Sequence, residues 1–289
     1  MRIARVLTTV CLLSSFLSAE NALQSAAISQ WQNRVFTLRS WFGGAQIQTD
    51  DQGNLLRGGP SVSWTVSRFQ VESVRFTHDK IELRGNRIGL FYDTNHQQLV
   101  NVRVAPLLLT VRADTTKLQP SDLDRIANAI FLTDGAQLTA ALPYFWKAWA
   151  IGGIKAVDNP KGKGQFYFLP NGPNAVRGVP PKLEAIATTA TGEQIFRVAP
   201  GITPPKVLKA IDPSYDDFAR SLRVQGKTVL AVVINAEGDV GDVQVARPLG
   251  MGLDERAVEA VRSWRFRPAM KDGQPVAVQV DVEVSFRLY

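Results

Sequence analysis

The stretch Val276–Leu288 reads VAVQVDVEVSFRL, and it decides the fold of the C-terminal part of the chain. Apolar residues occupy every second position of this stretch, and the residues between them are mostly polar. Side chains along a β-strand point alternately to the two faces of a sheet, so a period of two predicts a strand with one buried face. Such a strand needs a sheet beside it and a covering layer over it, which the residues before it must supply.

The preceding residues supply both. An apolar stripe at helical spacing consists of Leu253, Ala257, Ala260, Val261 and Trp264. Thr228–Ile234 is apolar on both faces, as a covered central strand requires, and Val240–Ala246 returns after a hairpin. Tyr215–Val224 predicts a short helix. The predicted order is α-β-β-α-β, a three-stranded antiparallel sheet with both helices on one side, so the fold class is α+β.

Residues 31–113 contain short runs of strand-forming residues separated by turn-forming pairs such as Gly85-Asn86. This pattern predicts a β-rich antiparallel meander, as a curled sheet or a small barrel. Two helices are predicted after it, one that starts at Ser121-Asp122 and one over residues 136–149 that is interrupted at Pro143. We expect the aromatic residues of the second helix to pack against the meander: Tyr144, Phe145, Trp146 and Trp149.

Composition divides the rest of the chain. Glycine and proline make up 16 of the 54 residues 152–205, against 38 of 289 in the whole sequence, which predicts an extended connector. Residues 6–19 form an uncharged, largely apolar run after two arginines, shorter than the ~20 residues that a membrane span needs. The predicted parts are a signal peptide (1–19), a β-rich domain with two helices (20–151), a connector (152–203) and a C-terminal domain (204–289).

Several functional classes are disfavoured by counting. The chain has one cysteine and two histidines, so we expect no metal site and no cofactor. Residues 204–289 carry 12 basic and 12 acidic residues, and no basic block predicts a nucleic-acid partner. Gly226-Lys227-Thr228 looks like the end of a phosphate loop, but Ser221 stands where its first glycine is required. We therefore predict that the protein is not an enzyme, and a hydrolytic N-terminal domain remains the weaker alternative.

Five short segments of the C-terminal domain match one known family in order. They are Pro213-Ser214-Tyr215, Gln225-Gly226-Lys227, Gly238-Asp239-Val240, Trp264-Arg265-Phe266-Arg267-Pro268 and Gly273-Gln274-Pro275. With these segments, residues 204–289 resemble the C-terminal domain of the TonB energy transducers. The resemblance implies a periplasmic module that couples inner-membrane energy to outer-membrane receptors. It would do so by binding a short extended receptor peptide, the TonB box.

The resemblance also implies where the peptide binds. In the family the peptide pairs with the last strand, which maps to Val276–Phe286, and the loop Asp212–Tyr215 would lie beside it. An exposed strand edge suits this role because its unpaired N–H and C=O groups accept an added strand of almost any sequence. The implied peptide-binding residues are Asp212, Pro213, Tyr215, Val276, Val278, Gln279, Val280, Asp281, Val282, Glu283 and Val284.

Two departures from the family pattern bear on function. Asp216 follows the tyrosine where the family often has proline, and Asp212 stands where well-studied members carry glutamine. Typical transducers have an uncleaved membrane helix and a Pro-rich spacer, whereas this chain has a predicted signal peptide and a β-rich domain. Outer-membrane TonB-dependent receptors are the expected partners, in the periplasm. Contact with inner-membrane motor proteins, an uncleaved inner-membrane anchor and a homodimer are left open.

The alternative hypothesis assigns the same strand edge a structural task. In it the protein is a periplasmic structural or adaptor protein, and the edge serves self-association or pairing between domains. The two hypotheses differ in whether the outer edge of Val276–Phe286 is free in the monomer.

Overall fold

The computed structural model describes residues 21–95, 97–146, 148–149, 156–157 and 186–288, so the predicted signal peptide lies outside the described residues. The described residues group into two compact units. The first holds the residues up to Val62 together with Ser67–Ile88 and Arg103–Asp134. The second holds Ser63–Val66, Gly89–Val102 and the residues from Gly135 onward. No helix among the described residues is long and apolar enough to cross a bilayer.

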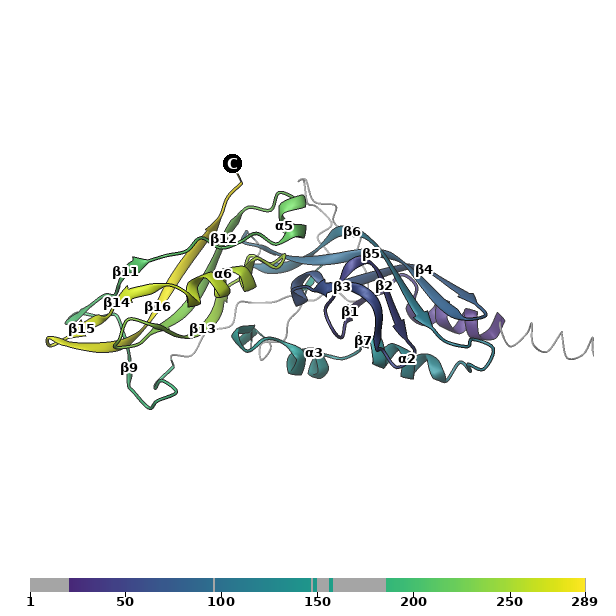
Figure 1. The fold of residues 1–289 in the computed structure, drawn as a ribbon, viewed down its shortest axis with the longest axis horizontal. Helices are drawn as coiled ribbons and strands as arrows, with labels where there is room; N and C mark the ends of the chain where they lie inside the picture. The colour runs from purple at the N-terminus through teal and green to yellow at the C-terminus, as the bar shows by residue number, and fades with distance from the viewer. Residues whose placement is uncertain (1–20, 96, 147, 150–155, 158–185, 289) are drawn as a thin grey trace, which may run out of the picture. The chain divides into compact units, whose positions relative to one another are not determined.

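A mixed sheet carries the β-rich part of the chain (Figure 1). Its strands are β1 (Val35–Leu38), β2 (Phe42–Asp50), β3 (Leu55–Ser61), β4 (Arg68–Thr77), β5 (Lys80–Asp93), β6 (Gln98–Arg112), β7 (Phe131–Leu132) and β8 (Ala156–Val157). Their order is β3-β2-β6-β5-β4-β1-β7, with β8 on β6. The β-rich prediction is confirmed, but the pairing is not purely antiparallel, because β2 and β8 both run parallel to β6.

The turn predicted at Gly85-Asn86 is wrong, because β5 runs through it as one strand. Glycine is needed there for a different reason. A Cβ atom on Gly85 would lie 1.8 Å from the carbonyl oxygen of Gln70, where the β4–β5 register shifts between Val71 and Ser73. Gly85 therefore admits a close backbone approach at a bulge, which is the second common use of glycine inside a strand.

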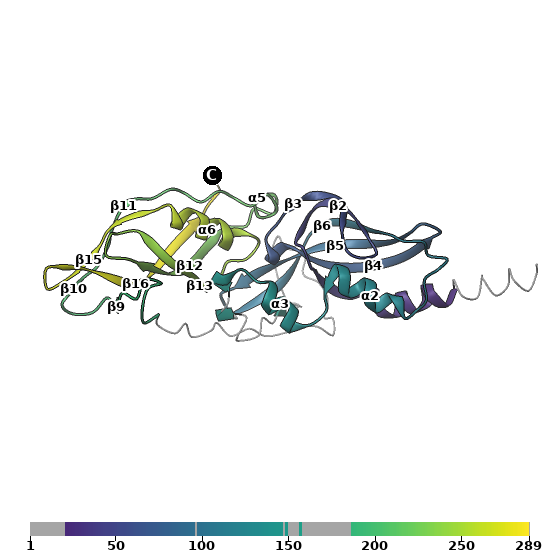
Figure 2. The same ribbon diagram turned by 60° about the horizontal axis from the view of Figure 1, so that its bottom comes forward.

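Two helices cover the first unit's core. Residues 21–31 are helical, and α2 (Asp122–Ile130) follows the predicted helix start. Figures 1 and 2 show the two helices side by side against the sheet, where the Gln30 side chain donates to the Asp124 carboxylate. Leu23, Trp31 and Ile126 belong to the same buried cluster. The second predicted helix is split as expected, into α3 (Gly135–Ala141) and a 3-10 turn, η2 (Tyr144–Trp146).

The second unit contains the predicted α-β-β-α-β arrangement with added short strands. Its elements are β9 (Ile195–Arg197), β10 (Ile202–Thr203), β11 (Lys206–Lys209), α5 (Asp217–Ser221), β12 (Gly226–Ile234), β13 (Val240–Arg247), α6 (Leu253–Arg262), β14 (Arg265–Arg267), β15 (Ala269–Lys271) and β16 (Gln274–Phe286). The sheet order is β10-β15-β16-β12-β13, with β9 on β16, while β11 and β14 form a separate ribbon. The α+β prediction is thus confirmed.

The buried face of this sheet follows the predicted alternation. Val278, Val284 and Phe286 of β16 are almost inaccessible, and they pair with residues of β12 that are equally buried or small. Helix α6 packs on β12 and β13 with its predicted stripe inward. The predicted core residues Phe266 and Phe286 are buried, whereas Trp264 is partly exposed.

Candidate peptide-binding edge

The two edges of the last strand, β16, differ in how far they are paired with other strands. Its inner edge pairs antiparallel with β12 from Val278 to Phe286. Before Val278 the strand pairs with β15, over Gln274–Val276, and its outer edge, opposite β12, is covered by β9, which runs parallel, over Ala277–Gln279. Within the part of the chain that the structure describes, no strand pairs with the outer edge of Val280–Phe286. We call these seven residues the open edge.

The implied peptide-binding residues of β16 therefore fall into two groups. Val276, Val278 and Gln279 lie on the part of the strand that β15 and β9 cover. The members on the open edge are Val280, Asp281, Val282, Glu283 and Val284. Sequence reasoning missed β9, since three residues carry almost no periodic signal, although the apolar Ile195 and Phe196 interrupt a polar stretch.

Side chains of the open edge alternate between the core and the opposite face of the sheet. Val284 and Phe286 are buried, whereas Asp281 and Glu283 are exposed. The Glu283 carboxylate lies 2.6 Å from Lys227 Nζ and 3.9 Å from an Arg247 nitrogen. Asp281 has no such ion pair among the described residues. One acid on this face is thus locally neutralised, and the other is available to a partner.

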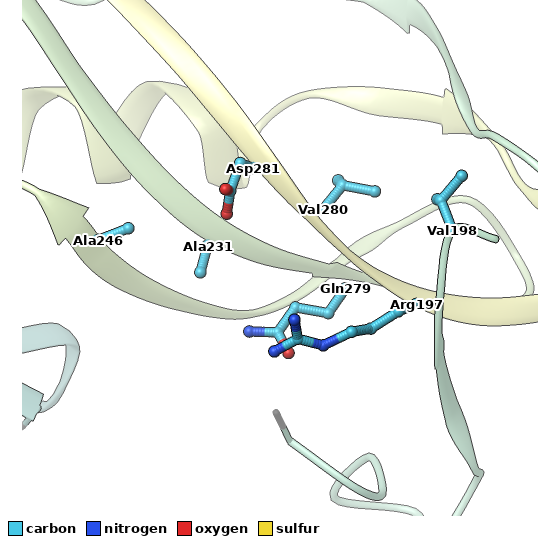
Figure 3. Close-up of a pocket in the computed structure, with 7 residues that line it drawn as sticks. All are labelled: Arg197, Val198, Ala231, Ala246, Gln279, Val280 and Asp281. Carbon is cyan, nitrogen blue, oxygen red and sulfur yellow. The ribbon is translucent and has the colours of Figure 1, made fainter. Parts of the chain in front are cut away.

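A cavity of about 490 Å³ lies where β9 ends and the open edge begins. Figure 3 shows the side chains of Gln279 and Arg197 extending together from the paired strands β16 and β9. Asp281 points toward Ala231, its partner on β12. The cavity therefore joins one end of the open edge and offers an acid, a base and an amide to the side chains of an added strand.

Tyr215 lies at the other end of the open edge. Its ring makes an edge-to-face contact with Phe286 at 5.5 Å between centroids, and its hydroxyl donates to the Val224 carbonyl oxygen at 2.8 Å. Burial raises the pKa of this phenol. The structure thus brings Tyr215 to β16, as the resemblance implied.

The loop before Tyr215 is held from the other side. The indole nitrogen of Trp264 donates to the Ile211 carbonyl oxygen at 2.9 Å, directly before Asp212. Asp212 is exposed and Pro213 is partly exposed. The segment from Ile211 to Tyr215 therefore runs from the end of α6 to the Phe286 end of β16, with the Asp212 side chain turned to solvent.

Asp216, which departs from the family pattern, is the N-cap residue of α5. Its carboxylate accepts from the backbone N–H of Phe218 at 2.9 Å and caps the first turn of α5. Such caps contribute about 1 kcal/mol to helix stability. Burial raises the pKa of this carboxyl despite the bonds it accepts. A side chain that caps α5 therefore occupies the position where the family often has proline.

Sequence reasoning missed a buried acidic pair at the start of α6. The Asp254 carboxylate accepts from the backbone N–H groups of Leu249 at 2.8 Å and Gly250 at 2.7 Å. Burial raises the pKa of Asp254 to about 6. For Glu255, burial and then the Asp254 charge raise the pKa to about 7.

The indoles of Trp146 and Trp149 have partners in two parts of the chain. Trp146 donates its indole N–H to Glu255 Oε1 at 3.1 Å, and Trp149 donates to the Val245 carbonyl oxygen at 2.9 Å. Trp146 also makes an edge-to-face contact with Trp64 at 5.0 Å between ring centroids, and Trp149 makes one with Tyr92 of β5 at 6.0 Å. These two indoles therefore contact residues of the meander as expected, and α6 and β13 in addition. The hydrogen bonds of their N–H groups to α6 and β13 are the part that hydrophobic spacing alone does not reveal.

Residues 212–288 match the family described as Gram-negative bacterial TonB protein C-terminal. We call this segment the TonB-like domain. No group of three or more histidine, cysteine, aspartate or glutamate side chains arranged to hold a metal ion occurs in the described residues.

Proteins named Protein TonB are similar to part of this chain. The Vibrio cholerae protein is 30% identical over 86 residues, 29% of this chain and 35% of the relative. The Xanthomonas campestris protein is 36% identical over 77 residues (26% and 34%), and the Escherichia coli K12 protein is 32% identical over 95 residues (32% and 38%). The chain thus spans about a third of the length of these curated relatives.

A solved structure is also similar to part of this chain. It is the solution NMR structure of the Pseudomonas aeruginosa TonB CTD, which is 25% identical and covers 31% of this chain and 89% of that one, with a TM-score of 0.25.

Proposed function

We propose that this chain is an exported, non-enzymatic TonB-like protein of the periplasm that takes part in energy-coupled transport. In this proposal its C-terminal domain binds an extended peptide of an outer-membrane receptor by strand addition. The observation that carries the proposal is the open edge, Val280–Phe286, at the margin of an otherwise paired strand. The match of residues 212–288 to the TonB C-terminal family supports it. The predicted division at residues 20, 152 and 204 is part of the same proposal.

The open edge limits what can bind. Successive residues of a strand direct their N–H and C=O groups to opposite edges, so about half of the seven residues face outward. Each backbone hydrogen bond to an added strand contributes about 0.5–1.5 kcal/mol net. Asp281, exposed and without an ion pair among the described residues, favours a basic residue opposite it in the added strand.

The test uses N-methylated peptides. Peptides from the N-termini of outer-membrane receptors of the same cell are titrated against the isotope-labelled chain, and amide shifts are followed by NMR. We expect shifts confined to Val280–Phe286 and to the neighbourhood of Tyr215. Methylating one peptide nitrogen at a time should weaken binding about tenfold at every second position, because only alternate N–H groups face β16. The insensitive positions are the matched controls.

Binding that does not alternate with a period of two, or the absence of shifts with every peptide, would exclude strand addition at this edge.

A second candidate function is favoured by β9. This strand already covers Ala277–Gln279, and Phe196 is held by Lys271 Nζ, which lies 4.4 Å from the centre of its ring. In the structural or adaptor hypothesis, the edge of β16 pairs with protein strands such as β9 and not with a receptor peptide. The two functions can be distinguished by whether β9 dissociates from β16 when a peptide binds.

We expect Phe196→Ala to loosen β9, because the substitution removes the ring that packs under Lys271. Hydrogen exchange at Ala277–Gln279 should then rise, while exchange over Val280–Phe286, which pair with β12 but not with β9, stays unchanged. Exchange measured by mass spectrometry on the two variants checks this, with Val198→Ala at an exposed neighbouring position as the control. Equal exchange in both variants would show that Phe196 does not anchor the strand.

A further inference from the structure

The ribbon formed by β11 and β14 carries an unusual group of exposed side chains. Seven large apolar residues in the described part of the chain are prominently exposed, and three of them lie within five positions: Val207 at 53%, Leu208 at 63% and Ile211 at 45%. The flanking residues of the ribbon are basic. We call Lys206–Lys209 together with Arg265 and Arg267 the basic ribbon.

The pairing register sets the face on which the charges lie. Lys206 pairs with Arg267, and Val207 pairs with Phe266, which is buried. Because directly paired residues share a face, Val207 lies on the side of Phe266 although it is itself exposed. Lys206 and Arg267 lie on the opposite, outer face. A bulge at Leu208 then brings Lys209 opposite Arg265, which returns both to that face. All four cations therefore project from one side of a two-stranded ribbon.

Most of this charge is not compensated locally. Arg265 Nε lies 3.0 Å from Asp239 Oδ1, but no ion pair joins Lys206, Lys209 or Arg267 to an acid in the described residues. Like charges directly opposite each other across a ribbon are destabilising. Residues 204–289 carry equal numbers of acids and bases, so the cluster reflects local placement and not general basicity. The arrangement favours an anionic partner.

The apolar residues indicate which kind of anionic partner. Leu208, the most exposed of the three, is the unpaired residue at the bulge, between the two cation pairs along the strand. Trp264 directly precedes β14. Its indole N–H donates to the Ile211 carbonyl oxygen, and its ring centre lies 6.2 Å from that of Phe266. Lysine and arginine beside exposed aliphatic residues and a partly exposed tryptophan are typical of surfaces that lie in a bilayer interface. In Figures 1 and 2 the strand β11 lies at the outer margin of its domain.

We propose that the basic ribbon docks the TonB-like domain on the surface of an anionic lipid bilayer. The four cations contact headgroup phosphates, and Leu208 enters the interface between them. This surface is distinct from the open edge of β16, so the proposal stands or falls independently of peptide binding.

The experiment measures binding of the full chain to vesicles by flotation. Neutral phosphatidylcholine vesicles are compared with vesicles that also contain phosphatidylglycerol, at low and at physiological ionic strength. Binding to the anionic vesicles is expected to exceed binding to the neutral ones and to weaken with salt. The double variant Lys206→Gln/Lys209→Gln should bind the anionic vesicles about 30-fold more weakly, equivalent to about 1 kcal/mol for each lysine.

The matched control is Arg34→Gln/Arg75→Gln, which removes the same charge from two exposed positions of the first unit. It should bind the anionic vesicles about as well as the unchanged chain. Leu208→Ser leaves the charge unchanged and should also weaken binding. All substituted side chains are exposed, so we expect equal melting temperatures.

Two results would overturn the proposal. The first is equal binding by the lysine variant and the arginine control, which would make the attraction a matter of total charge. The second is unchanged vesicle binding by Leu208→Ser, which would leave a purely ionic surface of the kind that an acidic protein contacts.

Discussion

Gly250→Ala is expected to destabilise the second unit by at least about 3 kcal/mol, because it combines backbone strain with a clash. Gly250 has a φ of +88°, and a Cβ atom there would lie 2.0 Å from the Leu90 carbonyl oxygen. That oxygen accepts from the Met251 backbone N–H at 2.8 Å, and Phe91 forms a β-bridge with Gly250. The added methyl group therefore pushes the Gly89–Val102 segment off the loop that precedes α6.

The control for this prediction is Gly201→Ala. Gly201 has nearly the same φ, +89°, but a Cβ atom there would meet nothing within 4 Å. The control isolates the backbone strain, about 1 kcal/mol for an alanine in the left-handed region. Urea unfolding of both variants gives the difference. If the two variants lose the same stability, the Leu90 carbonyl does not make the contact described.

The second large effect is a dependence of stability on pH. Burial raises the pKa of Asp254 from 3.8 to about 6, and burial with the Asp254 charge raises that of Glu255 from 4.5 to about 7. A group whose pKa is higher in the folded state stabilises the fold when protonated, and that stability is lost as the pH rises through the folded pKa. The free energy of unfolding should therefore fall between about pH 4.5 and 7, by about 3 kcal/mol from Glu255 alone.

Glu255→Gln should remove the Glu255 share of this slope, about half of it, and make the protein more stable than wild type above pH 7. The glutamine is neutral at every pH, and its amide oxygen can still accept from the Trp146 indole N–H. Glu259→Gln is the matched control, since Glu259 is exposed on the same helix with Arg256 3.3 Å away. Urea unfolding at several pH values between 5 and 8 decides the matter. A Glu255→Gln chain with the wild-type slope would show that this carboxyl does not carry the effect.

The hydrophobic periodicity of the sequence predicted those strands and helices whose pattern lies within one continuous segment. The alternation in β16 and the apolar stripe of α6 each occupy one continuous segment, and both elements formed where expected. Gly85 shows the limit of such reasoning, because the same conformational freedom serves a turn or a bulge, and the choice depends on β4. The helix over residues 21–31 was missed, although Leu23, Ala27 and Trp31 repeat every four residues.

The candidate site was predictable in position but not in extent. The resemblance pointed to Val276–Phe286, and the structure leaves Val280–Phe286 of that strand open. The difference depends on β9, whose pairing joins residues about eighty positions apart, Ile195 and Ala277. Asp254 and Glu255 looked like ordinary acids at a helix start, and only the packing of Trp146 and the loop before α6 buries them.

The long pairing between β16 and β12 has a mechanical consequence. Nine consecutive residue pairs join the two strands, from Gly226 with Phe286 to Ile234 with Val278. A ladder loaded along its own axis must break all its hydrogen bonds together, whereas one peeled from an end breaks them one at a time. Tension applied along β16 is therefore shared across the sheet, and a strand held at its outer edge resists a lengthwise pull far better than a sideways one.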